Sequence, residues 1–403
     1  MKNKSKRKFL KSLGSFGVFL AGANLPVWAI NTSVHAASSS LSYNLLEPDK
    51  NGLMLMKGFK SRIIAVSGDR IKAFKKFKWH RHADGGATFK TNDGGWIYVS
   101  NSEKGHREGG VGAIRFNRNA KIVDGYRICK NTNMNCAGGL TPWNTWLTCE
   151  EDVGGYTWEC DPFGKKKQIK IQSLGMFTHE AAAVDPRTSI IYQTEDTKEG
   201  GFYRFIPENK IIKIEQKAKE KKKFQVMQIK IDNTVQWNDV PDQIAKYKEP
   251  GKNKLMNSLM KRTANKKVNY TKFKRGEGAW YHDGKVHFAT TASHEIWTYD
   301  IRNNTCEVLY KKNKTGVLKD PDNVTVSKNG LVMAAEDSGN LEICGISKNG
   351  KAFPILRLPD HKGSELTGPA FDPSGRRLYF SSQRYKKKSY TFEVEGPFNS
   401  ISL

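Results

Sequence analysis

The stretch Gly330-Leu331-Val332-Met333-Ala334-Ala335-Glu336-Asp337 consists of a glycine turn, a short apolar strand and two acids. The same order of a turn, a short apolar strand and polar or acidic residues recurs along the chain. The six segments cover residues 94–103, 146–151, 189–196, 284–291, 330–337 and 375–384. Their starts lie roughly 45 residues apart, which is the length of a four-stranded propeller blade. The repeats therefore predict an all-β fold, a six-bladed β-propeller.

One interval between repeats, from Ile190 to Val286, is about twice as long as the others. It contains a Lys-rich stretch at about 209–274, which we interpret as an insertion between the third and fourth repeats. The competing interpretation is a seventh blade within this interval.

Each repeated strand is preceded by a second strand that starts with a polar residue followed by small ones. These starts are Asp84-Gly85-Gly86, Asn135-Cys136-Ala137, His179-Glu180-Ala181, Glu277-Gly278-Ala279, Asp322-Asn323-Val324 and Glu365-Leu366-Thr367. Tight-turn sequences such as Asp372-Pro373-Ser374-Gly375 join several of the pairs into hairpins. In an antiparallel hairpin, the start of the first strand and the end of the second lie at the same end. Two rings of polar residues are therefore expected at one mouth of the central channel.

The expected ring is strongly acidic and includes one thiol. Its members are Asp84, Glu103, Cys149, Glu150, Glu151, Glu180, Glu195, Asp196, Glu277, Asp322, Glu336 and Asp337. Carboxylates in a confined site raise one another's pKa and cannot all stay ionised without cations. An excess of oxygen ligands suits Ca²⁺, whereas a cysteine among them favours a softer transition metal such as iron. The sequence therefore predicts a mixed metal cluster.

Two arginines lie near this ring in the sequence. Arg275 precedes Glu277 by two residues, so in an extended strand both side chains face the same way. Arg384 ends the sixth repeat. An arginine beside a metal cluster suits bidentate binding of phosphate, and a charge partner for the acids is the alternative role.

The first 36 residues are expected to be an export signal. Lys2, Lys4, Lys6, Arg7, Lys8 and Lys11 precede an apolar stretch and small-residue cleavage candidates. The stretch 5–11 resembles a twin-arginine signal with lysine in place of the first arginine, and an ordinary secretory signal is the alternative. We expect residues 37–403 to form one propeller domain that is periplasmic or secreted, monomeric and not stably inserted in a membrane.

The net charge of +27 does not indicate a nucleic-acid partner. Part of it lies in the signal, and the Lys-rich loops contain few aromatic residues on which bases could stack. The six cysteines contain no CxxC pair, which argues against a tetrahedral zinc site.

The tract from Asn135 to Glu151, NCAGGLTPWNTWLTCEE, resembles the signature of PhoX-type alkaline phosphatases. Later tracts follow in the order of that family, namely 179–181, 194–197, 275–278, 321–323 and 335–338. The resemblance implies a six-bladed propeller that is exported by the twin-arginine machinery and binds two Fe³⁺ and two to three Ca²⁺ ions. It also implies the metal ligands Cys149, Glu150, Glu180, Asp196, Glu277, Asp322 and Glu336.

The resemblance further implies a phosphatase acting on phosphorylated small molecules, with Arg275 and Glu277 as catalytic residues and Arg275 in contact with the phosphate. Phosphate monoesters are the expected substrates, and diesters are left open. The chain is shorter than typical members, and Asn144 replaces a glycine usual in the signature. Two alternatives remain: a calcium-stabilised propeller that binds a ligand without catalysis, and a calcium-dependent lactonase-like hydrolase.

Overall fold

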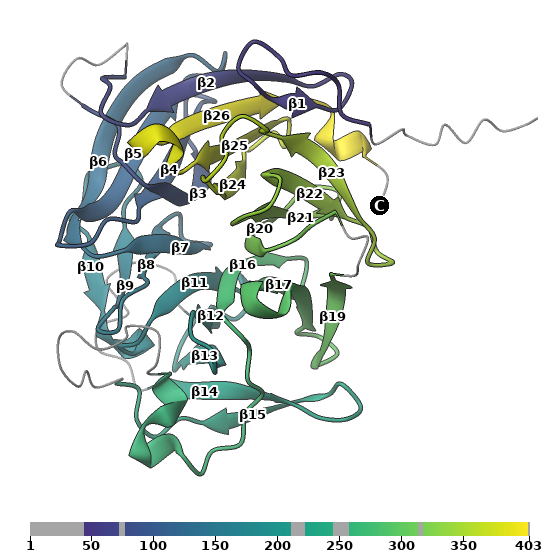
Figure 1. The fold of residues 1–403 in the computed structure, drawn as a ribbon. Coiled ribbons are helices and arrows are strands. Elements are labelled where there is room, and N and C mark those ends of the chain that lie inside the picture. Colours follow the sequence, from purple (N-terminus) through teal and green to yellow (C-terminus); the bar gives the residue numbers. More distant parts are fainter. Residues whose placement is uncertain (1–43, 72–76, 211–221, 245–257, 313–316, 402–403) are drawn as a thin grey trace, which may run out of the picture. The chain divides into compact units, whose positions relative to one another are not determined.

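In the computed structural model, residues 44–71, 77–210, 222–244, 258–312 and 317–401 are described. The expected export signal lies outside these residues. The described chain forms six antiparallel sheets that follow one another as the blades of a β-propeller (Figure 1). This confirms the predicted fold class.

The first three blades follow in chain order. Blade 1 contains β3 (Ala83–Lys90), β4 (Trp96–Ser102), β5 (Gly109–Phe116) and β6 (Ile122–Thr132). Blade 2 contains β7 (Asn135–Leu140), β8 (Trp146–Glu150), β9 (Thr157–Cys160) and β10 (Ile169–Ile171). Blade 3 contains β11 (His179–Val184), β12 (Ile191–Glu195), β13 (Phe202–Pro207), β14 (Lys222–Ile229) and β15 (Val235–Asp239).

The other three blades contain the C-terminal half of the chain and two N-terminal strands. Blade 4 contains β16 (Gly276–His282), β17 (Lys285–Thr290), β18 (Glu295–Asp300) and β19 (Thr305–Lys311). Blade 5 contains β20 (Pro321–Val326), β21 (Val332–Glu336), β22 (Glu342–Ile346), β23 (Ala352–Arg357) and β1 (Met54–Leu55). Blade 6 contains β24 (Leu366–Phe371), β25 (Arg377–Ser382), β26 (Tyr390–Glu395) and β2 (Lys60–Val66). Short 3-10 helices are η1 (Gln172–Leu174), η3 (Leu259–Lys261), η4 (Thr263–Asn265), η5 (Thr291–Ser293), η6 (Tyr385–Lys387) and η7 (Phe398–Ser400).

The Lys-rich interval contributes to blade 3. Within the stretch 209–274, β14 is the fourth strand of this blade and β15 adds a fifth. In the described part of this interval, no separate sheet forms a seventh blade.

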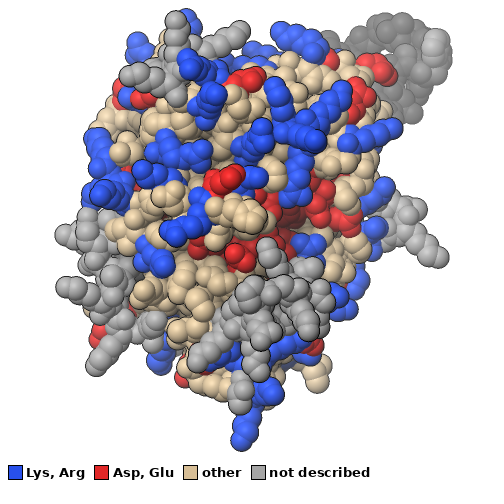
Figure 2. Space-filling view, turned by 60° about the vertical axis from the view of Figure 1, so that its left-hand side comes forward, with Lys and Arg blue, Asp and Glu red and all other residues tan. Residues whose placement is uncertain are grey.

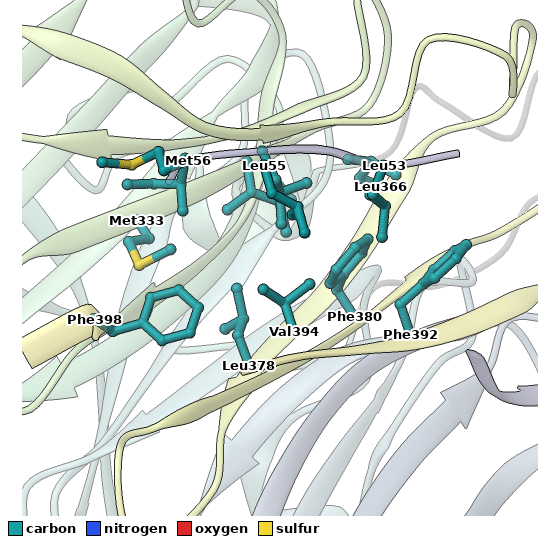
Figure 3. Close-up of a cluster of buried hydrophobic side chains, with 14 of the residues drawn as sticks. Leu53, Leu55, Met56, Met333, Leu366, Leu378, Phe380, Phe392, Val394 and Phe398 are labelled. Carbon is teal, nitrogen blue, oxygen red and sulfur yellow. The ribbon is translucent and has the colours of Figure 1, made fainter. Parts of the chain in front are cut away.

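The N-terminal strands close the ring, because β2 pairs with β26 and β1 pairs with β23. A buried cluster under these strands joins blades 5 and 6 (Figure 3). Leu53, Leu55 and Met56 pack there with Phe380 and Phe398 from the C-terminal end. The pairing of β2 with β26 adds a fourth strand to the last blade and joins the two ends of the described chain in one sheet.

Candidate metal centre

The six inner strands carry the same irregularity close to the point where each begins. In β3, β7, β11, β16 and β20, the pairing register shifts immediately after the first residue, and in β24 it shifts one residue later. A β-bulge of this kind re-aims a side chain that regular pairing would place elsewhere. In the first five strands the second residue lies at the bulge. These second residues are Asp84, Cys136, Glu180, Glu277 and Asp322.

The small residues after each bulge let neighbouring inner strands approach closely. A Cβ atom on Gly85 would lie 2.6 Å from the Cα atom of Ala137, and one on Gly278 would lie 2.7 Å from the Cα atom of Asn323. A side chain at either glycine would force the strands apart. The polar-then-small pattern therefore brings the residues at the bulges together around the channel.

Two overlapping groups of side chains could each hold a metal ion. The donor atoms of Cys136, Glu151 and Glu180 lie within 4.8 Å of one another, and so do those of Glu180, Glu277 and Asp322. Glu180 belongs to both groups. Figure 2 shows Asp and Glu side chains gathered near the middle of one face, among Lys and Arg side chains.

The electrostatics of the cluster favour a bound cation. Both carboxylate oxygens of Glu180 are buried without a hydrogen-bond partner among the described residues. Burial and then the neighbouring charges of Glu277 and Glu151 raise the pKa of Glu180 well above its usual range. Burial is also the main cause that raises the pKa of Asp322 to about 8. A buried, unpaired carboxylate costs several kcal/mol, so the residues present fit a metal.

Cys136 is the cysteine at the cluster. Its pKa is raised well above the usual range by burial, and then by the charges of Asp84 and Glu180. Cys149 packs instead with Leu147 and Phe177 in a buried apolar cluster, 3.8 Å from the hydroxyl of Thr157. The expected position of Cys149 in the channel is therefore corrected: alternation along β8 turns its side chain into the space between blades.

Glu150 and Glu336, two further predicted ligands, also face their own blades. Glu150 accepts hydrogen bonds from the backbone N–H groups of Asn133 at 2.8 Å and Tyr156 at 3.0 Å. Glu336 accepts two backbone hydrogen bonds in the same way, at 2.8 Å and 2.9 Å. These carboxylates hold loop backbone and are not part of either donor group.

Glu195 repeats this arrangement in blade 3. Its carboxylate accepts hydrogen bonds from the backbone of Gly201 and Leu259 and from the hydroxyls of Tyr203 and Ser258. Gly201 and Tyr203 belong to the start of β13 and its preceding turn, and Ser258 and Leu259 to the start of η3. Glu195 thus ties η3 to the sheet rather than facing the channel.

Arg275 lies at the rim of the cluster with its side chain 35% exposed. Its Nε and Nη2 atoms donate to the two carboxylate oxygens of Asp196, both at 2.9 Å, and Nη2 lies 3.2 Å from Glu277 Oε1. The backbone of Arg275 has a φ of 57°, a strained value for a non-glycine residue. Backbone hydrogen bonds with Thr197 and Thr291 hold this conformation. Strain of this kind is common at functional sites.

Asp196 and Arg384 each form ion pairs with side chains near the mouth. Asp196 is fully buried and is occupied by Arg275, so the structure pairs it with a cation of the chain itself. Arg384 lies next to Glu103 and Glu365, and its side chain is 46% exposed. Sequence reasoning missed Cys136 as a candidate metal ligand. The signal was its place between a polar residue and Ala137, the same pattern that precedes Glu180.

At the turn before β8, Asn144 has a φ of 61°, which explains how it stands where the family usually has glycine. Asparagine tolerates this left-handed conformation better than most residues. The substitution is compatible with the tight turn between β7 and β8.

No helix in the described part of the chain has the length and apolar character needed to span a bilayer.

No curated protein sequence matches the chain. The solved structure of Pseudomonas fluorescens PhoX in complex with vanadate, a transition state analogue, superposes with a TM-score of 0.70. It is 16% identical and covers 89% of this chain and 97% of that one. A Bacteroides thetaiotaomicron protein of unknown function gives a TM-score of 0.49 at 11% identity, over 84% of this chain and 76% of that one.

The sequence also matches the family model of alkaline phosphatase PhoX over residues 75–157, 152–307 and 297–384. These matches span most of the chain and contain both donor groups, Arg275 and Arg384. The chain therefore belongs to the PhoX family of alkaline phosphatases and is a phosphoric ester hydrolase.

Proposed function

We propose that this chain is an exported, metal-dependent phosphatase that hydrolyses phosphate monoesters at the acidic mouth of the propeller. The observation that carries the proposal is Glu180. Its two buried oxygens have no partner among the described residues, and its carboxylate is shared by two donor groups. A shared carboxylate suits two neighbouring metal ions.

The ligand set that fits best is Cys136, Glu151, Glu180, Glu277 and Asp322. Cys136 replaces Cys149 in the proposal, because a thiolate ligand must lie beside the carboxylates. A thiolate among carboxylates favours iron, and the remaining oxygen donors favour calcium. Two Fe³⁺ and two to three Ca²⁺ ions, as the family resemblance implies, remain part of the proposal.

Metal ions bound at this site would supply Lewis acidity toward the phosphoryl oxygens and lower the pKa of water. The side chains of the chain would bind and orient the ester. Arg275 uses Nε and Nη2 for Asp196 and Glu277, which leaves Nη1 to donate to a phosphoryl oxygen. Since Asp196 and Glu277 fix the guanidinium on two sides, Arg275 needs little reorganisation to stabilise the developing charge.

Glu277 has two proposed roles. It lies within the second donor group and 3.2 Å from Arg275, so it links the metal site to the phosphate-binding arginine. Burial raises the pKa of Glu277 well above its usual range, followed by the charges of Asp196 and Asp322. A bound cation would keep this carboxylate ionised and in contact with Arg275.

A calcium-stabilised propeller without catalysis would not need a thiol at the cluster. The position of Cys136 beside Glu151 and Glu180 therefore favours the phosphatase over that alternative. The same argument disfavours a calcium-dependent lactonase-like site, because calcium is bound by oxygen ligands and such a site needs no cysteine.

The test combines metal analysis of the purified protein with hydrolysis of p-nitrophenyl phosphate. We expect iron together with calcium, and activity that a chelator removes. Arg275→Lys should lower kcat/KM at least about 10-fold, because lysine cannot reproduce the planar fork of arginine. The matched control is Arg115→Lys, since Arg115 forms a surface pair with Asp93 far from the cluster in the fold. Calcium alone without hydrolysis, or an unchanged Arg275→Lys variant, would contradict the proposal.

A further inference from the structure

Two of the six cysteines lie in one buried cluster formed by neighbouring blades. Cys129 lies in β6, the outer strand of blade 1, and Cys160 ends β9 in blade 2. Both side chains belong to one buried apolar cluster, with exposed fractions of 1% and 0%. The chain segments around the two cysteines are in contact, since the hydroxyl of Tyr126 in β6 donates a hydrogen bond of 2.8 Å to the carbonyl of Pro162. Burial, followed by the interaction with Cys129, raises the pKa of Cys160.

The other four cysteines have different surroundings. Cys149, Cys306 and Cys344 lie in three separate apolar clusters, and Cys136 lies at the acidic mouth. All six are within the described part of the chain, and each is a free thiol in the structure. In the described residues, no other two cysteines share a buried cluster.

We propose that Cys129 and Cys160 form a disulfide bond that joins blade 1 to blade 2 once the chain is in an oxidising compartment. Disulfides form and persist in such compartments and are rare in the cytosol. The bond would close a loop that contains β7 and β8, the two strands that place Cys136 and Glu151. It would therefore constrain the segment that supplies two of the three residues of one donor group.

The chemistry is a thiol–disulfide exchange with a protein disulfide of the thiol-oxidase class. One cysteine thiolate attacks a sulfur of the oxidant's disulfide and releases one oxidant thiolate. The second cysteine thiolate then displaces the oxidant from the mixed disulfide, which releases the other oxidant thiolate. Two electrons pass to the oxidant, and two protons leave the cysteines. Because both sulfur atoms are buried in the folded protein, the oxidant must reach them before the two blades pack together. The bond therefore requires export by the ordinary secretory route, in which the chain folds after it has crossed the membrane.

The first test counts thiols in the full-length protein secreted into a bacterial periplasm. The protein is denatured with a chelator, alkylated with iodoacetamide and weighed, with and without prior reduction. We expect four alkylated cysteines before reduction and six after it, with one cross-linked peptide pair that contains residues 129 and 160. Six alkylated cysteines before reduction, or a bond between another pair, would overturn the proposal.

The second test measures the thermal midpoint with and without a reductant. Reduction of the wild type should lower Tm by about 5 °C or more, since the bond restricts the unfolded chain. Cys129→Ser and Cys160→Ser should show the lower Tm and no response to reductant. The control Cys306→Ser changes a buried free cysteine in another cluster, so its response to reductant should persist. These readouts do not depend on metal binding or phosphatase activity, so either proposal can fail alone.

Discussion

Adjacent acids at the ends of the second strands have opposite environments. In Glu150-Glu151 and Glu195-Asp196, the first carboxylate turns into its own blade and accepts hydrogen bonds there. The second acid faces the central mouth, where Glu151 joins a donor group and Asp196 binds Arg275. The same residue type therefore supports a loop at one position and the candidate site at the next.

This difference follows from where each strand ends. Glu150 and Glu195 are the last residues of β8 and β12, whereas Glu151 and Asp196 lie just beyond the strands, where the chain turns at the mouth. The two cysteines of the signature tract also differ in environment. Cys136 lies at the bulge of β7 and reaches the cluster, whereas Cys149 in β8 packs among apolar side chains.

Removal of each cysteine of the signature tract tests most strongly whether Cys136 and Cys149 have different roles. We expect Cys136→Ala to lose bound iron and to reduce kcat/KM more than about 100-fold, since even the loss of groups that only orient metal ligands costs 10–100-fold. Cys149→Ala should keep its iron and activity and lose only stability. The measurements are metal content, the visible spectrum and phosphatase kinetics.

Both cysteine variants remove a buried side chain, so Cys149→Ala controls for the general cost of a cavity. The comparison would fail if Cys149→Ala lost iron while Cys136→Ala retained it. That result would restore the ligand assignment that the family resemblance implies.

A second prediction separates the two adjacent acids of blade 2. Glu150→Ala should lower the free energy of unfolding by about 1–3 kcal/mol, because two backbone N–H groups lose their acceptor. Glu151→Gln should instead lower the metal content. Without metal it should be at least as stable as the wild type, because burial and the charge of Asp196 disfavour ionised Glu151.

Urea unfolding with and without a chelator, together with metal analysis, checks the two variants. Each serves as the control for the other, since they are neighbours in one strand end. Equal metal loss in Glu150→Ala and Glu151→Gln would show that the carboxylate of Glu150 also contributes to the metal centre.

The sequence repeats were sufficient to predict the propeller and the mouth at which the acids gather. Turn residues that recur with a period of about 45 residues indicate four-stranded propeller blades. The assignment of single residues failed where strand alternation and the bulge decide it. Glu336 and Asp337 look equivalent in the sequence, and only the register of β20 with β21 shows that Glu336 belongs to the blade. Cys136 required the bulge at the start of β7, which depends on the neighbouring inner strands.

The smallest expected effect concerns pH. Asp322 has a folded-state pKa of about 8, raised by burial and by Asp337, above its unfolded value of about 4. A raised carboxyl pKa gives stability at low pH that is lost as pH rises toward the folded value. The chelated protein should therefore lose a few degrees of Tm between about pH 5 and pH 8.

Added Ca²⁺ should reduce this loss, because a bound cation stabilises the ionised carboxylates of the central mouth. In the chelated protein, Asp322→Asn should make Tm depend less on pH. The surface variant Asp93→Asn should keep the pH dependence of the wild type. Differential scanning fluorimetry across this pH range measures all three proteins. A constant Tm of the chelated wild type across this pH range would contradict the prediction. It would show that ionisation of the buried acids at the mouth does not destabilise the fold. These acids would then not differ electrostatically from the acids that accept backbone hydrogen bonds.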